Sequence, residues 1–215
     1  MKFLHIISLL FSLLFFTACS ANFKYELRTG FLDSYDGLEK VSTDKVHFFQ
    51  TMDDANLSAY DKIYIPDIKV FSNTQETSPT DNKLYTLISE YTSAAYRKNI
   101  MKSSANYSMV DVAQEGTIIM QIAISAVEVY PHNEEWDNLS AIAFTLNEST
   151  QKQYKKGNVR LLIEARITDA MNEKLLAHSM RVIMDEEIHS NKKYLSFSNI
   201  QASLDKWLYK AIIKH

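Results

Sequence analysis

Cysteine, proline and glycine are all scarce in this chain of 215 residues, which has one, three and four of them respectively. A single cysteine cannot form an intramolecular disulfide, and it excludes a metal site built from several thiolates. So little glycine and proline excludes a collagen-like chain or a long flexible linker. We therefore expect a fold that is stabilised by its core, without covalent or metal crosslinks.

Positive charge is not in excess, because 23 Lys and Arg residues stand against 26 Asp and Glu residues and the formal net charge is −3. A protein that binds nucleic acid needs a basic surface to neutralise phosphates, so we expect no nucleic-acid partner. Hydrophobic residues make up 46% of the chain, which is too apolar for an intrinsically disordered protein. The composition predicts one domain with a sizeable core.

Long apolar runs are also missing, apart from the segment Phe3 to Phe16. About fourteen residues span roughly 21 Å as a helix, short of the roughly 30 Å of a bilayer core. Thr17 and Ala18 are small residues that a signal peptidase accepts, and Cys19 follows them directly. The pattern predicts a lipoprotein signal peptide over residues 1–18 rather than a transmembrane helix.

The sequence around Cys19 resembles the bacterial lipobox, in which small residues lead into a cysteine that becomes lipidated. The resemblance implies that acyl chains on Cys19 hold the chain at a membrane surface, as they do in bacterial lipoproteins. Ser20 stands where Asp would resemble an inner-membrane retention signal, which implies the outer membrane and a domain that faces the periplasm. The alternative is an ordinary secretory signal with an incidental cysteine.

Residues 19–59 carry little periodicity and predict a lipidated N-terminus followed by an extended arm with turns. The side chains expected to lay this arm across the domain are Phe31, Leu32, Tyr35 and Leu38. Residues 60–215 predict a single periplasmic domain. Its first strand, within residues 61–71, changes phase at Pro66, which suits an edge or a bulge.

Three further strands follow from the pattern of apolar residues. Residues 117–130 are rich in β-branched side chains and predict a strand buried on both faces. Residues 159–168 alternate in polarity, which predicts a half-buried strand. A turn at Asp169 to Asn172 then leads into a return strand over residues 175–184.

Two helices complete the expected fold. Ser78, Pro79 and Asp81 form a helix start, and an apolar stripe then continues to an end near Met101. The last helix is expected to begin near Ser196 or Ser198. The predicted stripes are Leu84, Ile88, Tyr91 and Ala95 in the first helix and Ile200, Leu204, Trp207, Leu208 and Ala211 in the last. The order predicts an α+β two-layer sandwich, a largely antiparallel sheet with both helices packed on one face.

Several of these blocks together resemble the family of bacterial lipoproteins catalogued as domain of unknown function 3313. The blocks are Gly30 to Leu38, the strand from Tyr60 to Val70, the hairpin with Asp169-Ala170, and the closing Leu204-Asp205-Lys206-Trp207. The resemblance implies a lipidated protein without an established activity. Where the family often has Gly in the hairpin turn, this chain has Asn172, which can also adopt a left-handed conformation.

No motif for catalysis or phosphate binding is present, and the histidines are scattered. His132 with Glu134 and Glu135, and the segment from Asp185 to His189, could hold a cation, but solvated loop ends are the favoured interpretation. His178 falls in the return strand and is expected to be a core or rim residue rather than a ligand. We therefore expect no enzyme activity, no cofactor and no metal.

Two features are candidates for binding a partner. Tyr35 with Asp33 and Asp36 forms the most suggestive exposed group, although a turn pinned by an aromatic plug is the favoured interpretation. Trp136 lies in a polar segment, where a large aromatic side chain is costly to hydrate unless it packs or binds. The leading hypothesis is a module that binds another envelope protein, and the alternatives are a small-ligand carrier and an enzyme of unrecognised type.

Overall fold

The computed structural model describes residues 29–41, 47–71, 79–103, 107–130, 156–189 and 196–213. The predicted signal, the lipidation site Cys19 and the candidate Trp136 lie outside the described residues.

The described strands form one open sheet of eight strands in the order β1-β2-β8-β7-β6-β3-β5, with β4 also paired to β6. The strands are β1 (Glu39–Lys40), β2 (His47–Thr51), β3 (Lys62–Tyr64), β4 (Lys69–Val70), β5 (Ser108–Val110), β6 (Thr117–Tyr130), β7 (Lys156–Asp169) and β8 (Leu175–His189). The neighbouring strands β1, β2, β8, β7 and β6 pair antiparallel, each with the next. The pairs β3–β6, β4–β6 and β3–β5 are parallel. The helical segments are η3 (Leu57–Ala59), α2 (Pro79–Ser103) and α3 (Phe197–Ile213).

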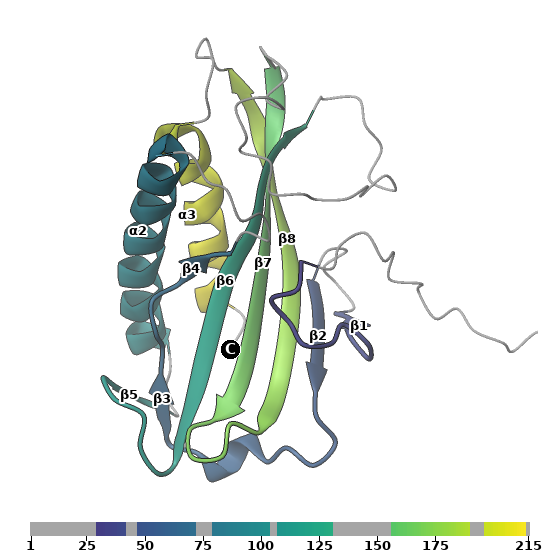
Figure 1. Cartoon of the computed structure of the whole chain (residues 1–215), viewed down its shortest axis with the longest axis vertical. Coiled ribbons are helices and arrows are strands. Elements are labelled where there is room, and N and C mark those ends of the chain that lie inside the picture. Colours follow the sequence, from purple (N-terminus) through teal and green to yellow (C-terminus); the bar gives the residue numbers. More distant parts are fainter. Residues whose placement is uncertain are drawn as a thin grey trace, which may run out of the picture.

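The predicted α+β sandwich with a largely antiparallel sheet is confirmed. Both helices lie on the same side of the sheet, and residues 29–38 lie on the other side (Figure 1). The hydroxyl of Tyr96 on α2 contacts the sulfur of Met120, and Met120 pairs with Ile167 of β7. Ile167 therefore lies on the helix side of the sheet, together with Met120. Side chains alternate along a strand, and Glu164 is three positions from Ile167, so Glu164 projects from the face opposite the helices.

The three central strands carry most of the core. β6 has the predicted bounds, and its helix-facing Ile118, Ile122 and Ile124 are buried. β7 was expected to be half-buried, but this is wrong for its middle, where consecutive residues 159–164 are all buried. The physical reason is that its second face is covered too. β8 also runs beyond the predicted residue 184, to His189.

The turn between β7 and β8 uses a different residue from the one expected. Asn172 does not have a positive φ; Glu173 does, at 59°. Oδ1 of Asp169 accepts the backbone N–H groups of Met171 and Asn172 at 2.7 and 3.1 Å. Oδ1 of Asn172 accepts the N–H of Lys174 at 2.9 Å. Asn172 therefore acts through its side chain, and the left-handed step falls one residue later.

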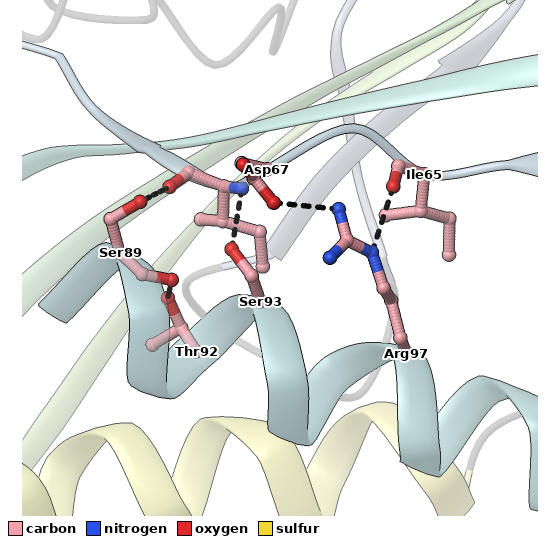
Figure 2. Close-up of polar contacts among 7 residues, drawn as sticks. Ile65, Asp67, Ser89, Thr92, Ser93 and Arg97 are labelled. Carbon is pink, nitrogen blue, oxygen red and sulfur yellow. Dashed lines mark hydrogen bonds and ion pairs between the residues drawn. The ribbon is translucent and has the colours of Figure 1, made fainter. Parts of the chain in front are cut away.

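The predicted break at Pro66 separates β3 from β4, and both short strands pair with β6. Between them, side chains of α2 replace the missing partners for the backbone, as Figure 2 shows. Ser89 donates to the carbonyl oxygen of Ile68 at 2.6 Å, and Ser93 accepts the Ile68 N–H at 2.8 Å. Arg97 donates to the carbonyl oxygen of Ile65 at 3.0 Å. Three helical positions four residues apart thus hold the chain where it leaves the regular ladder.

The buried line along α2 differs from the predicted stripe. Leu84 and Ile88 are buried as expected, but the line continues through Thr92 and Tyr96, each less than 10% exposed, rather than through Tyr91 and Ala95. Thr92 is accommodated because its hydroxyl donates to the carbonyl oxygen of Ile88 at 2.6 Å. Apolar periodicity alone misplaces the stripe because this buried face contains polar residues.

α3 begins after Ser196, as predicted, with a reciprocal cap. The N–H of Ser196 donates to Oδ1 of Asn199 at 2.9 Å, and the N–H of Asn199 donates to the carbonyl oxygen of Ser196 at 2.9 Å. Trp207 is buried and stacks on Tyr96, with ring centroids 5.4 Å apart. Neither described helix has an apolar stretch that could cross a bilayer.

Candidate functional site

A buried glutamate occupies the middle of the sheet, on the face away from the helices. Glu164 of β7 pairs with Ala123 of β6 and Met180 of β8, and its exposed fraction is 0%. An isolated carboxylate in such a place is strongly disfavoured, so its partners decide its state. Two of its partners come from residues 29–38, which we call the arm from here on, and a third, Ser125, comes from β6.

Two hydroxyl groups of the arm occupy the two carboxyl oxygens of Glu164. The hydroxyl of Tyr35 donates to Oε1 at 2.6 Å. The hydroxyl of Thr29 donates to Oε2 at 2.5 Å. Tyr35 and Thr29 are themselves only 6% and 8% exposed, so the whole cluster is sheltered from water. Hydrogen bonds in such surroundings are stronger than in water, and losing one is correspondingly costly.

The Tyr35 oxygen also closes a loop within the arm. It accepts the backbone N–H groups of Thr29 and Gly30, both at 3.1 Å. Gly30 has a φ of 86°, a conformation that glycine adopts far more readily than other residues. The arm therefore turns back on itself at Gly30, which lets one phenol oxygen serve both the arm and the sheet.

Burial dominates the electrostatics of the cluster. Burial raises the pKa of Glu164, while hydrogen bonds from Ser125, Thr29 and Tyr35 act in the opposite direction. The pKa of Tyr35 is also raised, first by burial and then by its bond to Glu164. Folding thus shifts the ionisation of Glu164 to higher pH, and Tyr35 keeps its proton at neutral pH.

Apolar and charged contacts surround this polar centre. Leu32 is 4% exposed and joins the core. Phe31 packs edge-on against Phe71, with ring centroids 5.6 Å apart, and the Arg166 guanidinium lies 5.6 Å from the Phe31 ring. Arg166 also lies 3.6 Å from a carboxylate oxygen of Asp33. Leu38 packs against the core as well, so the four predicted side chains hold residues 29–38 against the domain, whereas residues 39–40 and 47–51 of the predicted arm are the strands β1 and β2.

A second buried polar pair lies on the same face of the sheet. His178 of β8 is 3% exposed, and its Nε2 lies 2.7 Å from Oε1 of Gln50 on β2. Burial lowers the pKa of His178, so the neutral ring is favoured. The expectation that His178 is a core or rim residue is confirmed.

The structure separates the predicted partner-binding residues. Asp33 and Asp36 are exposed, whereas Tyr35 is buried, so the expected exposure of Tyr35 is wrong. The Tyr35 hydroxyl faces the sheet because it donates to Glu164 and accepts hydrogen bonds from two backbone N–H groups. The alternative interpretation, an aromatic plug that pins a turn, describes its position. Binding of a partner by Asp33 and Asp36 stays a prediction, and Trp136 lies outside the described residues.

Sequence reasoning missed Glu164 and Thr29 as members of a site. Glu164 stands at a polar position of an alternating strand, which predicts a solvent-facing side chain. A signal was nevertheless present in the run Leu161-Leu162-Ile163, because consecutive apolar residues indicate a strand that is covered on both faces.

The interpretation of the candidate cation positions as solvated loop ends is wrong for one of the two segments. Residues Asp185 to His189 belong to β8 rather than to a loop end, and His132 lies outside the described residues. Within the described ranges, no group of three or more His, Cys, Asp or Glu side chains is arranged to hold a metal ion.

A single protein-family model covers both the arm and the sheet. A family described as a protein of unknown function, DUF3313, matches residues 28–211. The chain belongs to the DUF3313 family. The match begins beside Thr29 and continues into α3, so it spans all the described strands of this DUF3313 chain. No curated protein matches it in sequence.

Several solved structures are similar to this DUF3313 chain at low identity. The PelC dodecamer from Paraburkholderia phytofirmans has 8% identity and a TM-score of 0.37, covering 79% of this chain and 99% of the other. The hypothetical protein CT253 from Chlamydia trachomatis has 6% identity and a TM-score of 0.39, with coverages of 71% and 95%. The lipoprotein GNA1162 from Neisseria meningitidis has 11% identity and a TM-score of 0.32, with coverages of 72% and 99%.

Proposed function

We propose that this chain is a lipoprotein anchored through Cys19 in the outer membrane, with its α+β domain facing the periplasm and binding another envelope protein. The observation that carries the anchor is its only cysteine, which directly follows two small residues at the end of the apolar segment Phe3 to Phe16. Several acyl chains, at about 0.8 kcal/mol for each buried methylene, bind a bilayer stably.

A role without catalysis is supported by the state of the buried polar groups. Both oxygens of Glu164 accept hydroxyl groups, and the ring of His178 is bonded to Gln50. Glu164 and His178 do lie on one face, as an enzyme hypothesis requires, but they are 0% and 3% exposed. Burial to this extent supports a role that does not use either group for catalysis.

The carrier hypothesis predicted a cavity beneath the arm or near Trp136. Beneath the described part of the arm, Leu32 and Tyr35 are buried against the sheet. We therefore favour a protein partner, for which the exposed Asp33 and Asp36 are the candidate contacts on the arm. Tethering supports such binding because it confines the domain to a thin layer and raises its effective concentration there.

The anchor is tested by feeding cells a labelled fatty acid and isolating the full-length protein. We expect label on the wild type, none on Cys19→Ala, and loss of the wild-type membrane fraction in that variant. Density-gradient separation of inner and outer membranes then tests the location. An unlabelled wild type that fractionates like Cys19→Ala would overturn the anchor.

The partner is tested by photo-crosslinking in live cells from positions 33, 36 and 136. Position 171 is a matched control, since Met171 is 68% exposed in the β7–β8 turn and is not among the predicted contacts. We expect one discrete adduct from at least one test position and none from the control. If no test position traps a protein, or if all four trap the same set, the binding role fails.

A further inference from the structure

We propose that the outer face of the two helices rests on an anionic lipid surface and so orients the domain beside its membrane. This helical face consists of the exposed residues Lys83, Leu87, Glu90, Ala94, Lys98, Met101 and Lys102 of α2 and Tyr209 of α3. The inference rests on the proposed lipid at Cys19, because that anchor keeps the domain next to a bilayer. Three properties of the helical face support it: its position on one side of the domain, its apolar side chains and its charge.

The exposed side chains of both helices lie on the outer side of the helical layer. Exposed positions of α2 recur every three or four residues, which places them on one side of the helix: 83, 87, 90, 94, 98 and 101. Figure 1 shows α2 and α3 side by side on one face of the sheet. The two helices also contact each other, since Tyr96 of α2 stacks on Trp207 of α3. Their exposed sides therefore form one outer surface.

The helical face carries most of the large apolar side chains that the described part of the chain leaves exposed. Five such side chains are exposed, and three of them belong to this face, namely Leu87, Met101 and Tyr209. Met101 and Tyr209 are 62% and 64% exposed, although water solvates apolar surface poorly. Tyrosine is typical of membrane–water interfaces, because its ring is apolar while its hydroxyl stays hydrated. These side chains suit a shallow contact with lipid.

The charge of the helical face favours anionic lipid. Three lysines are exposed on α2, Lys83, Lys98 and Lys102, against the exposed carboxylate of Glu90. On α3, the carboxylate of Asp205 accepts the hydroxyl of Tyr91. None of the ion pairs between described residues involves the three lysines, so they are available to lipid phosphates. Each lysine near an anionic surface strengthens binding about fivefold.

The arm, on the opposite side of the sheet, carries the opposite charge. It exposes Asp33 and Asp36, and it lies on the far side of the sheet from the helices (Figure 1). An anionic surface attracts the lysines of α2 and repels these two carboxylates, so both effects turn the helices toward the lipid. In that orientation Asp33 and Asp36 face away from the membrane, where the proposed protein partner can reach them.

The orientation is tested with a fluorescent dye on Ala94→Cys in the full-length, lipidated protein. Cys19 is the only natural cysteine and is acylated in the proposed lipoprotein, so the introduced thiol alone takes the dye. The protein is reconstituted into vesicles of phosphatidylcholine with or without phosphatidylglycerol, and acrylamide quenches dye that remains in water. We expect phosphatidylglycerol to reduce quenching at position 94 at least about threefold, and high salt to restore it.

Ser34→Cys places the dye on the arm and is the matched control for position. Ser34 is exposed, as Ala94 is, but lies on the other side of the sheet. Quenching at position 34 should be the same in both kinds of vesicle. Equal protection at positions 34 and 94 would mean that lipid contacts the domain without orienting it, which overturns the inference.

The charge of the helical face is tested by replacing its three lysines together, as Lys83→Gln, Lys98→Gln and Lys102→Gln. The ratio of protected to quenched dye at position 94 should fall on the order of a hundredfold. The matched control changes the net charge equally at exposed positions outside the helical face, as Lys40→Gln, Lys69→Gln and Lys174→Gln. This control should keep the protection of the wild-type charge.

The apolar contact is tested by Tyr209→Ser, which should also reduce protection at position 94. Its control is Val112→Ser, which removes an exposed apolar side chain from the loop after β5 and should have no effect. Equal effects of the two changes would contradict a contact through Tyr209.

Three further outcomes decide the inference. It fails if position 94 stays quenched on vesicles with phosphatidylglycerol, or if the two triple variants lose protection equally. It also fails if position 94 is protected in native membranes but not in vesicles of pure lipid, because the helical face then binds a protein. A free thiol at Cys19 in the wild type instead refutes the anchor on which the inference rests.

Discussion

The hydroxyl of Tyr35 lies 2.6 Å from Oε1 of Glu164, although the two residues are 129 positions apart in the chain. Tyr35 comes from a segment without regular structure, and Glu164 comes from β7, the strand shared by the two longest antiparallel pairings of the sheet. This contact explains how a glutamate in the middle of the sheet can be fully buried.

Replacing Tyr35 by Phe should reduce the free energy of unfolding by about 2 kcal/mol, because a buried carboxyl oxygen loses its donor. Urea denaturation of the domain measures this value. The m-value should also fall if the arm is already undocked in the folded state, since less surface is then exposed on unfolding.

The comparison for that loss is Tyr91→Phe, which removes a tyrosine–carboxylate bond to Asp205 at the exposed edge between α2 and α3. Water can replace this bond, so the loss should be clearly smaller than for Tyr35→Phe. Equal losses would show that burial adds nothing to the Tyr35–Glu164 bond.

Glu164→Gln should change how stability depends on pH. Burial raises the pKa of Glu164 in the folded chain, so its protonated form is favoured there. Such a group stabilises the fold below its ordinary pKa and loses that contribution as the pH rises through its folded pKa. Gln is uncharged at every pH and imitates the protonated carboxyl.

The difference in unfolding free energy, wild type minus Glu164→Gln, should therefore fall as the pH rises above about 4, by at most about 1.4 kcal/mol per pH unit. Subtraction removes the opposite contribution of Asp169, whose pKa is lowered chiefly by its bond from Tyr60. Equilibrium unfolding at several pH values measures it. A difference that grows with pH would mean that the bonds from Tyr35 and Thr29 outweigh desolvation.

Elements whose cause is local were predictable from the sequence. The β-branched run of β6, the start of α3 at Ser196 and the break at Pro66 follow from propensity and capping, and the structure has them where expected. The short strand β2 was missed, although His47-Phe48-Phe49 is rich in aromatic residues, because five residues leave little periodicity to detect.

The buried site could not be predicted in the same way, because its cause is long-range. Glu164 is buried by an arm far away in sequence, and an alternating strand predicts solvent on its polar face whether or not something covers it. Thr92 and Ser93 were missed for a related reason. Their burial depends on the bonds that Thr92 makes within α2 and that Ser93 makes with Ile68, and neither bond leaves an apolar pattern.

Glu173→Gly should raise the free energy of unfolding by about 0.5 to 1 kcal/mol, because Glu173 holds a φ of 59° that costs a side-chain-bearing residue. The gain is limited by the larger entropy of glycine in the unfolded chain. Asn172→Gly should instead lower stability, since it removes the acceptor of the Lys174 N–H. Thermal unfolding of both variants measures the contrast, and stabilisation by Asn172→Gly alone would contradict the observed turn.

Ser93→Ala should cost more stability than Ser89→Ala, although both serines bond the backbone of Ile68 from α2. Ser93 is the acceptor for the Ile68 N–H, and a buried N–H without a partner costs about 1 to 3 kcal/mol. Ser89 donates to the Ile68 carbonyl oxygen, and carbonyl groups tolerate the loss of one partner better. Urea denaturation of the two variants compares them directly. If Ser89→Ala is the more destabilising, then the carbonyl bond, and not the N–H bond, holds the chain at the break between β3 and β4.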